Sequence, residues 1–259
     1  MKAPRVTHNL TLDVESSGRA AGDQGPPDLA LRSALADLLE LLDCRRVRAT
    51  FFVLARDLDG LAPVLQQAVQ SGHEVGSHGL EHHRADGLTP MAFRAELRES
   101  RHRIEDVTQR PCVSYRAPWF SAPPPVEAGW FFEAMAVEGF RFDYSLRLPL
   151  AEAAVYRSPT PGVGERPVPI VSWGCGTIGV LGGLSLRVLP KMMVRSLVRR
   201  VSRSGVSACV YLHPYEWYRP AVTGHGLRRR LGLARTLTRL DWLLAEEAFE
   251  SLSREEVCM

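Results

Sequence analysis

The chain has 259 residues, of which 45% are hydrophobic, so it can bury the core of one large domain or of two small ones. Its formal net charge of +3 excludes a strongly basic nucleic-acid binder. The five cysteines are widely separated and contain no Cys-x-x-Cys pair, which argues against a disulfide framework and against a thiolate zinc site. We find no signal-peptide core and no run near the roughly 18 apolar residues of a membrane span, so we expect a cytoplasmic protein.

Apolar patterning predicts strands and helices in alternation along the chain. The strands are expected at 6–14, 47–54, 73–77, 112–118 and 208–213. The helices are expected at 29–42, 61–72, 89–107, 126–140 and 233–249. A loop is expected at 16–28, and the pattern loosens between Arg147 and Gly183.

This alternation indicates parallel βαβ units, in either a barrel or a doubly wound sheet. Two local signals support the helix boundaries: Thr89 precedes Pro90 as an N-cap, and Gly72 follows the second helix. No internal repeat or linker divides the chain, so we expect residues 1–259 to form a single domain.

Three histidines and a glutamate lie in the stretch SHGLEHHR, residues 77–84. His78 and His82 follow a predicted strand, and a helical turn would place residues four apart on one face, within reach of one ion. By itself this pair leaves two interpretations open, a metal site or a polar surface turn. His73 and His83 fit a structural or surface role better, and His8, His102 and His225 are expected at the surface.

Other strands of the predicted sheet also end in polar residues. Asp13 and Glu15 end the first strand, Arg116 lies at the end of the strand at 112–118, and His213 ends the strand at 208–213. The carboxyl ends of parallel strands meet at one edge, where α/β proteins build their sites. We therefore expect these residues to gather with His78 and His82.

Six segments in this order resemble the polysaccharide deacetylases with a NodB homology domain: TLDVE, ATFFV, GHEVGSHGLEHH, SYRAPWFS, GFRFDYSL and YLHPYE. The similarity is greatest to the branch with a D-V-E first motif found beside exopolysaccharide and exosortase loci. The resemblance implies a distorted (β/α)7 barrel of α/β class. It further implies a divalent metal, usually Zn²⁺ with Co²⁺ or Ni²⁺ as alternatives, and hydrolysis of an N-acetyl group on an amino sugar.

The resemblance also assigns roles. His78 and His82 become metal ligands, Asp13 the general base with Arg116 as its partner, and His213 the general acid. The backbone N–H of Trp119 joins the oxyanion site, and the rings of Trp119 and Tyr215 form a sugar platform. These two rings are equally well explained as ordinary wall residues.

One position departs from the family pattern. Most members carry a second aspartate as third metal ligand where this chain has Val14. Glu15 is the substitute, because Asp13 and Glu15 share a face of an alternating strand. A site completed by water instead would bind metal weakly or be inactive.

Three functions therefore remain open: an amino-sugar N-deacetylase, a deacylase or deformylase of a non-polysaccharide amide, and a catalytically silent glycan-binding barrel. Asp143 is interpreted as a turn cap, with a site role as the alternative. The basic segments 189–203 and 227–239 are expected to be solvated barrel helices, or a peripheral contact with anionic lipid. The exact sugar and the oligomeric state are not specified by the sequence.

Overall fold

The computed structural model describes residues 7–15, 29–173, 176–179, 181–218 and 231–250. The loop expected at 16–28, His225 and the first residues of the basic segment 227–239 lie outside these ranges. All the following statements concern the described residues.

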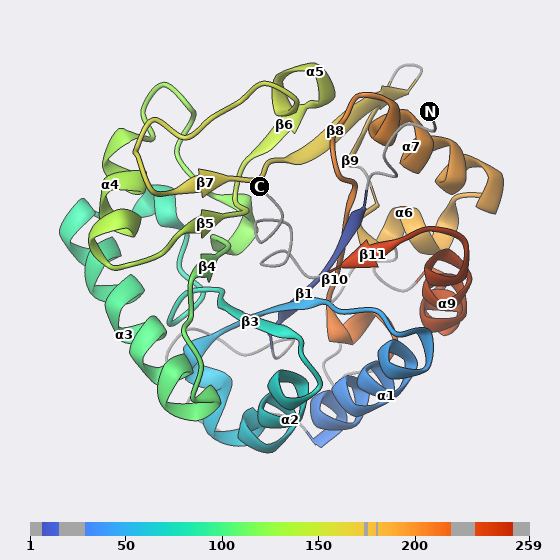
Figure 1. Ribbon diagram of the computed structural model, residues 1–259, viewed down its shortest axis with the longest axis horizontal. Helices are drawn as coiled ribbons and strands as arrows, with labels where there is room; N and C mark the ends of the chain where they lie inside the picture. Colours follow the sequence, from blue (N-terminus) through green and yellow to red (C-terminus); the bar gives the residue numbers. More distant parts are fainter. Residues whose placement is uncertain (1–6, 16–28, 174–175, 180, 219–230, 251–259) are drawn as a thin grey trace.

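A curled sheet of parallel strands forms the centre of the molecule, in the order β10-β1-β2-β3-β4-β5-β7 (Figure 1). The path from β10 to β7 does not close, and β11 (Phe249–Glu250) pairs with the outer part of β1. This architecture confirms the predicted distorted (β/α)7 barrel. The strands of the path are β1 (His8–Val14), β2 (Thr50–Val53), β3 (Glu74–Ser77), β4 (Ser114–Tyr115), β5 (Phe142–Asp143), β7 (Gly164–Glu165) and β10 (Cys209–Leu212).

Helices surround this sheet on its outside (Figure 1). They are α1 (Leu29–Arg45), α2 (Leu58–Gln70), α3 (Pro90–Thr108), α4 (Gly129–Val137), α5 (Leu150–Ala153), α6 (Gly183–Val188), α7 (Lys191–Arg203) and α9 (Thr236–Glu246). The expected boundary signals are present. The Thr89 hydroxyl accepts a hydrogen bond from the Ala92 N–H at 3.2 Å, and Gly72 follows α2 with φ of +83°.

The loosely patterned region contains a second, smaller sheet. It consists of β6 (Arg147–Pro149), β8 (Val168–Trp173) and β9 (Gly176–Gly179), with β8 and β9 antiparallel. Its short strands and frequent Pro and Gly explain why the apolar pattern was weak there.

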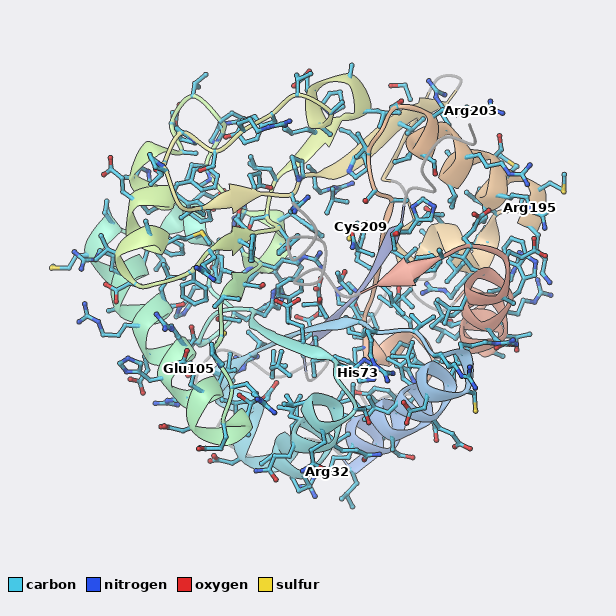
Figure 2. The ribbon with its side chains drawn as sticks, in the orientation of Figure 1. Arg32, His73, Glu105, Arg195, Arg203 and Cys209 are labelled. Carbon is cyan, nitrogen blue, oxygen red and sulfur yellow. The ribbon has the colours of Figure 1, made fainter. Side chains whose placement is uncertain are left out.

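Side chains of β1 alternate between two environments. Leu10, Leu12 and Val14 face outward into the apolar core between sheet and helices. Asn9, Thr11 and Asp13 lie on the opposite, inner face, as does Cys209 of the neighbouring β10 (Figure 2). The barrel interior is therefore polar along β1.

The surface role expected for His8 is wrong. His8 is 2% exposed, and its Nδ1 accepts a hydrogen bond from the Ala208 N–H at 3.2 Å. Burial lowers its pKa to about 4. The alternating pattern of β1 did not reveal that α7 covers the start of this strand, where Ser202 lies 3.3 Å from His8 Nε2. None of the described helices is both long and apolar enough to cross a bilayer.

Candidate functional site

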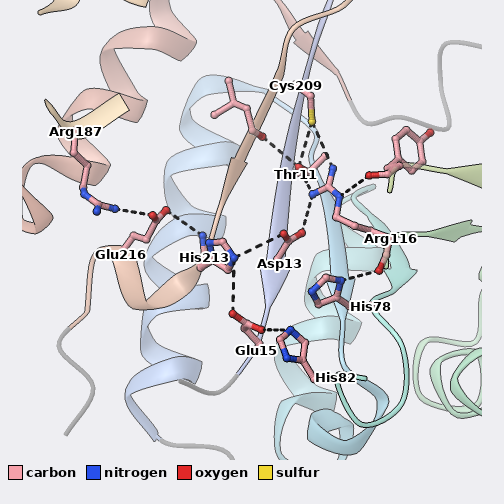
Figure 3. A network of polar contacts seen from close by, with 12 residues as sticks. Thr11, Asp13, Glu15, His78, His82, Arg116, Arg187, Cys209, His213 and Glu216 are labelled. Carbon is pink, nitrogen blue, oxygen red and sulfur yellow. Dashed lines mark hydrogen bonds and ion pairs between the residues drawn. The ribbon is translucent and has the colours of Figure 1, made fainter. Parts of the chain in front are cut away.

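The carboxyl edge of the sheet carries a buried ion pair between Asp13 and Arg116. Arg116 Nη1 donates to Asp13 Oδ1 at 2.7 Å and to Thr11 Oγ1 at 2.8 Å (Figure 3). The guanidinium lies over the ring of Phe52, 4.4 Å from its centroid. Burial raises the pKa of Asp13, but the charge of Arg116 and of nearby histidines outweighs it, so the pKa is lower than usual. Asp13 is therefore an ionised carboxylate at neutral pH, held in one orientation.

Glu15, His78 and His82 form a compact group beside this pair. One possible ligand atom from each lies within 4.8 Å of the others. His82 Nε2 is 2.7 Å from Glu15 Oε2. His78 Nδ1 is 2.8 Å from the Arg116 carbonyl oxygen, which can only accept, so this nitrogen carries the proton and Nε2 keeps a free lone pair.

The helical turn expected for residues 78–82 is wrong. Gly79 has φ of +89° and His82 has φ of +66°, so the segment is an irregular loop. The loop nevertheless brings the two imidazoles together, with ring centroids 5.4 Å apart. Positive φ angles within the segment are incompatible with a right-handed helical turn.

The charge state of this group suits a divalent cation. Burial lowers the pKa of His78, although Asp13 and Glu15 oppose the shift, so this imidazole is neutral. Burial raises the pKa of Glu15, but the hydrogen bond from His82 and the charge of His213 reverse this effect and lower it. A neutral imidazole and an ionised carboxylate are the ligand forms that zinc and similar ions require.

His213 completes the polar group from β10. Its Nε2 lies 3.8 Å from both Asp13 Oδ2 and Glu15 Oε1, while its buried Nδ1 has no partner among the described residues. Glu216 Oε2 accepts from the His213 backbone N–H at 3.2 Å, and Arg187 Nη1 binds the other oxygen of Glu216 at 2.6 Å (Figure 3). The ring of Tyr215 stacks on His213 with centroids 4.8 Å apart. This second ion pair fixes the turn after β10.

A cavity of about 260 Å³ opens above these residues. All the residues predicted for the site line it except Arg116, which lies beneath its floor. Trp119 is 58% exposed at its edge and packs against His82, with ring centroids 4.9 Å apart. Three further residues that were not predicted also line the cavity: Phe120, Arg147 and Tyr211. Tyr211 was accessible to sequence reasoning, because it shares a strand face with Cys209 and His213.

Other candidates lie apart from this cavity. His73 is buried and accepts from the Ala49 N–H at 3.1 Å, and His83 contacts Glu96 at 2.5 Å near the surface. Asp143 is buried, and its Oδ1 accepts from the Ser145 hydroxyl at 2.5 Å. The same hydroxyl accepts from the Ala117 N–H at 2.7 Å. Asp143 thus supports the segment that follows Arg116.

Two families match the sequence. Residues 22–126 match the polysaccharide deacetylase family, and residues 145–256 match a domain of unknown function (DUF3473). A peptidoglycan deacetylase of Helicobacter pylori is 27% identical over 148 residues, 54% of this chain and 49% of that protein. The chain therefore spans about half the length of this curated relative.

Solved structures share the fold. A polysaccharide deacetylase of Mycobacterium smegmatis superposes with a TM-score of 0.65 at 17% identity, covering 98% of this chain and 91% of that one. A carbohydrate esterase family 4 pseudoenzyme of Bacillus anthracis superposes with a TM-score of 0.56 at 16% identity, covering 96% of this chain and 65% of that one.

Proposed function

The chain belongs to the polysaccharide deacetylase family, and on that premise we propose that it is a metal-dependent amidohydrolase. Its substrate is the N-acetyl group of an N-acetylhexosamine unit in a glycan, glycolipid or sugar-containing precursor. One observation carries the proposal: Glu15, His78 and His82 offer three ligand atoms within 4.8 Å, beside the Asp13–Arg116 pair and His213.

Each side chain has a role that follows from its surroundings. Glu15, His78 and His82 would hold the divalent ion, which when bound lowers the pKa of water and polarises the acyl oxygen. Asp13, ionised and oriented by Arg116, takes the proton from the attacking water. His213 donates a proton to the leaving amine. The backbone N–H of Trp119 contributes to the oxyanion site.

The cavity supports a sugar-sized ligand. Trp119 and Tyr215 offer ring faces to a sugar, and Arg147 adds a cationic side chain to the same wall. Zinc is the ion we propose, since two imidazoles and one carboxylate are a common zinc donor set in catalytic sites. Cobalt and nickel accept the same donors.

Metal content and acetate release test the proposal together. We expect about one zinc per chain by elemental analysis of tag-free protein, and acetate release from N-acetylglucosamine oligomers. The double variant His78→Ala, His82→Ala should lose both, whereas His83→Ala should keep both because His83 contacts Glu96 outside the group. Protein that binds no zinc, cobalt or nickel when these are supplied would refute the proposal.

A catalytically silent glycan-binding barrel is the second candidate, favoured by Val14. Val14 is fully buried in the apolar core and supplies no ligand. A fold neighbour is itself a pseudoenzyme. Binding of N-acetylglucosamine oligomers without metal uptake or acetate release would favour this candidate over the enzyme.

We also propose that α6 and α7 contact anionic membrane surfaces. Val188 of α6 and Met192 of α7 are 51% and 71% exposed. Arg199 is exposed on α7, as is Arg203 (Figure 2). Exposed apolar side chains beside arginines suit a negatively charged bilayer. Equal sedimentation with anionic and neutral vesicles would contradict this proposal.

Finally, we propose that residues 1–259 form one domain, although two families match different parts of it. The parallel pairing of β1 with β10 supports this, because it joins the two ends of the chain in one sheet. Limited proteolysis should yield no independently stable fragment ending between residues 126 and 145.

A further inference from the structure

A second cavity, of about 560 Å³, lies at the opposite end of the barrel from the candidate active site. We call this recess the rear cavity. It opens at the start of β1 and β10, beside β7, and is lined by Asn9, Tyr156, Glu165 and Cys209, among others. Among the described residues it shares no lining residue with the cavity above Asp13. It is thus a separate recess that reaches the barrel interior from behind.

Cys209 connects this recess to the catalytic arginine. Its Sγ lies 3.5 Å from Arg116 Nη2 and 3.6 Å from Thr11 Oγ1 (Figure 3). Arg116 in turn binds Asp13 at 2.7 Å. Cys209 is 6% exposed and lines the recess, whereas the fully buried Cys112 and the exposed Cys44 of α1 do not line it.

Unpartnered polar atoms show that the recess suits a polar ligand. Asn9, 4% exposed, is the register partner of Cys209 on β1, and its Nδ2 has no hydrogen-bond partner among the described residues. The buried hydroxyl of Tyr156 likewise has none. Buried donors of this kind cost free energy unless a ligand or water accepts from them.

The charged side chains that line the rear cavity favour a negatively charged ligand. Arg157 and Arg166 line the recess, and Glu165 is the one acidic residue among the described lining residues. Burial and the adjacent Asp143 carboxylate raise the pKa of Glu165 well above its usual range, which disfavours its negatively charged form. A ligand that accepts hydrogen bonds and carries carboxylates therefore fits best.

We propose that Cys209 is a modification site for a small acidic thiol, which enters the rear cavity as its disulfide. The sulfur of Cys209 attacks the disulfide RS–SR, a Cys209–S–S–R bond forms, and the RS–SR bond breaks. The released thiolate takes up the proton of the Cys209 thiol and leaves as RSH, so the exchange needs no other oxidant.

The adduct acts on the site through Arg116. A substituent on Sγ displaces the sulfur from Arg116 Nη2 and crowds Thr11, which shares Nη1 with Asp13. The Asp13–Arg116 pair is then misplaced. The resulting loss of deacetylation rests on the proposed function, whereas the modification itself does not.

Oxidised glutathione and cystamine, an acidic and a basic disulfide, provide the test. The full chain is treated with each, and peptide mass mapping measures the fraction of Cys209 modified. Glutathione should modify Cys209 faster than cystamine does, and acetate release should fall about tenfold or more, as expected when a catalytic group is misplaced. The unfolding midpoint should fall as well, a readout that needs no activity.

Matched variants separate the steps, each compared with its own untreated sample. Cys209→Ser should abolish the sensitivity, while Cys44→Ser should keep it. The exposed Arg157→Glu should slow glutathione several-fold without slowing cystamine. An unmodified Cys209, or equal rates for the two reagents, would overturn the proposal. A modified Cys209 with unchanged activity and midpoint would overturn the coupling to Arg116, and an adduct on a protein with no deacetylase activity would count against the proposed function alone.

Discussion

At the residue scale, Arg116 holds several acceptors at once from a fully buried position. Besides Asp13 and Thr11, its Nε donates to the Tyr144 carbonyl oxygen at 3.3 Å. The fixed N–H directions of a planar guanidinium allow hydrogen bonds to all these acceptors at once, which a lysine ammonium group could not make. The residue therefore links the stability of the barrel interior to the orientation of the base.

Arg116→Gln should lower the free energy of unfolding by about 3–5 kcal/mol at pH 7, because it leaves Asp13 buried without a counter-charge. The folded pKa of Asp13 is depressed, so the pair stabilises the protein above the ordinary carboxyl pKa and loses this effect as the pH falls through the folded value. The deficit should thus shrink below about pH 4. Urea titrations at pH 7 and in acid measure it.

Arg103→Gln is the control for this prediction. Arg103 binds Glu99 at 2.6 Å on the exposed face of α3, where a pair contributes at most about 1 kcal/mol. If both variants lost the same free energy of unfolding, the buried Asp13–Arg116 pair would contribute no more to stability than an exposed pair.

Glu15→Gln should weaken zinc binding about tenfold or more, because an amide replaces the one carboxylate of the ligand group. Competition with a chromogenic chelator measures the change. Glu96→Gln, next to His83 and outside the group, should leave the affinity unaltered. Undiminished zinc affinity in Glu15→Gln would mean that the ion is held without Glu15.

Strand-end reasoning could predict Asp13, Arg116 and His213 because parallel strands place their carboxyl ends at one edge. The alternation of β1 placed Glu15 on the same face as Asp13, whereas its role as a metal ligand came from the family resemblance. Strand-end reasoning could not predict Arg147, since that side chain comes from the small sheet, whose packing depends on tertiary contacts. Trp119 and Tyr215 line the cavity, and their contact with a sugar stays a prediction.

At the element scale, the loop after β4 is supported from behind by the turn after β5. The Ser145 hydroxyl joins the two, since it accepts from Ala117 N–H and donates to Asp143. Ala117 precedes Pro118 and Trp119, which carries φ of +61°. A backbone held in this region persists only when its neighbours fix it.

Ser145→Ala should therefore lower kcat about tenfold with little change in KM, because the Arg116–Trp119 segment loses its anchor. It should also cost about 1–3 kcal/mol of stability, the usual penalty for an unsatisfied buried group. Thr108→Val removes another buried hydroxyl, bound to the Ile104 carbonyl oxygen at 2.7 Å, at the far end of α3. Thr108→Val should lose stability with kcat unchanged. If kcat of Thr108→Val fell as much as that of Ser145→Ala, the loss of activity would be a general effect of destabilisation.

The loop that carries His78 and His82 shows why element-scale prediction was only partly right. Spacing of four residues suggested a helical turn, whereas positive φ at Gly79 and His82 produced the same proximity by another route. Side-chain spacing constrains which residues can meet, but the backbone path depends on the loop's own packing. The expected helices were found because their apolar faces repeat over many residues.

At the scale of the whole molecule, the repeated strand–helix alternation predicted parallel βαβ units but left a barrel and a doubly wound sheet as alternatives. The resemblance to the polysaccharide deacetylases selected the distorted barrel. The open edge between β7 and β10 was not predictable, since nothing local marks the strand at which a sheet stops. The rear cavity proposed to admit a disulfide lies beside that edge. Its polar lining residues come from distant parts of the chain.

Buried neutral histidines make the stability of the molecule depend on pH. Burial lowers the pKa of His8 and of His73 to about 4. As the pH falls below about 6.5, the unfolded chain binds these protons first, so the folded state loses stability until the pH reaches the folded value. Glu165 acts in the opposite direction, because its raised pKa favours the folded state on acidification. A single pH curve therefore mixes both effects.

A difference between variants isolates one histidine. The stability of His73→Gln relative to the wild type should rise by about 2 kcal/mol when the pH is lowered from 7 to 5, because every other titration cancels in the difference. Urea denaturation at the two pH values measures it. Thr108→Val, which changes no titratable group, should show a constant difference. A constant difference for His73→Gln as well would mean that His73 is protonated within the folded barrel despite its burial.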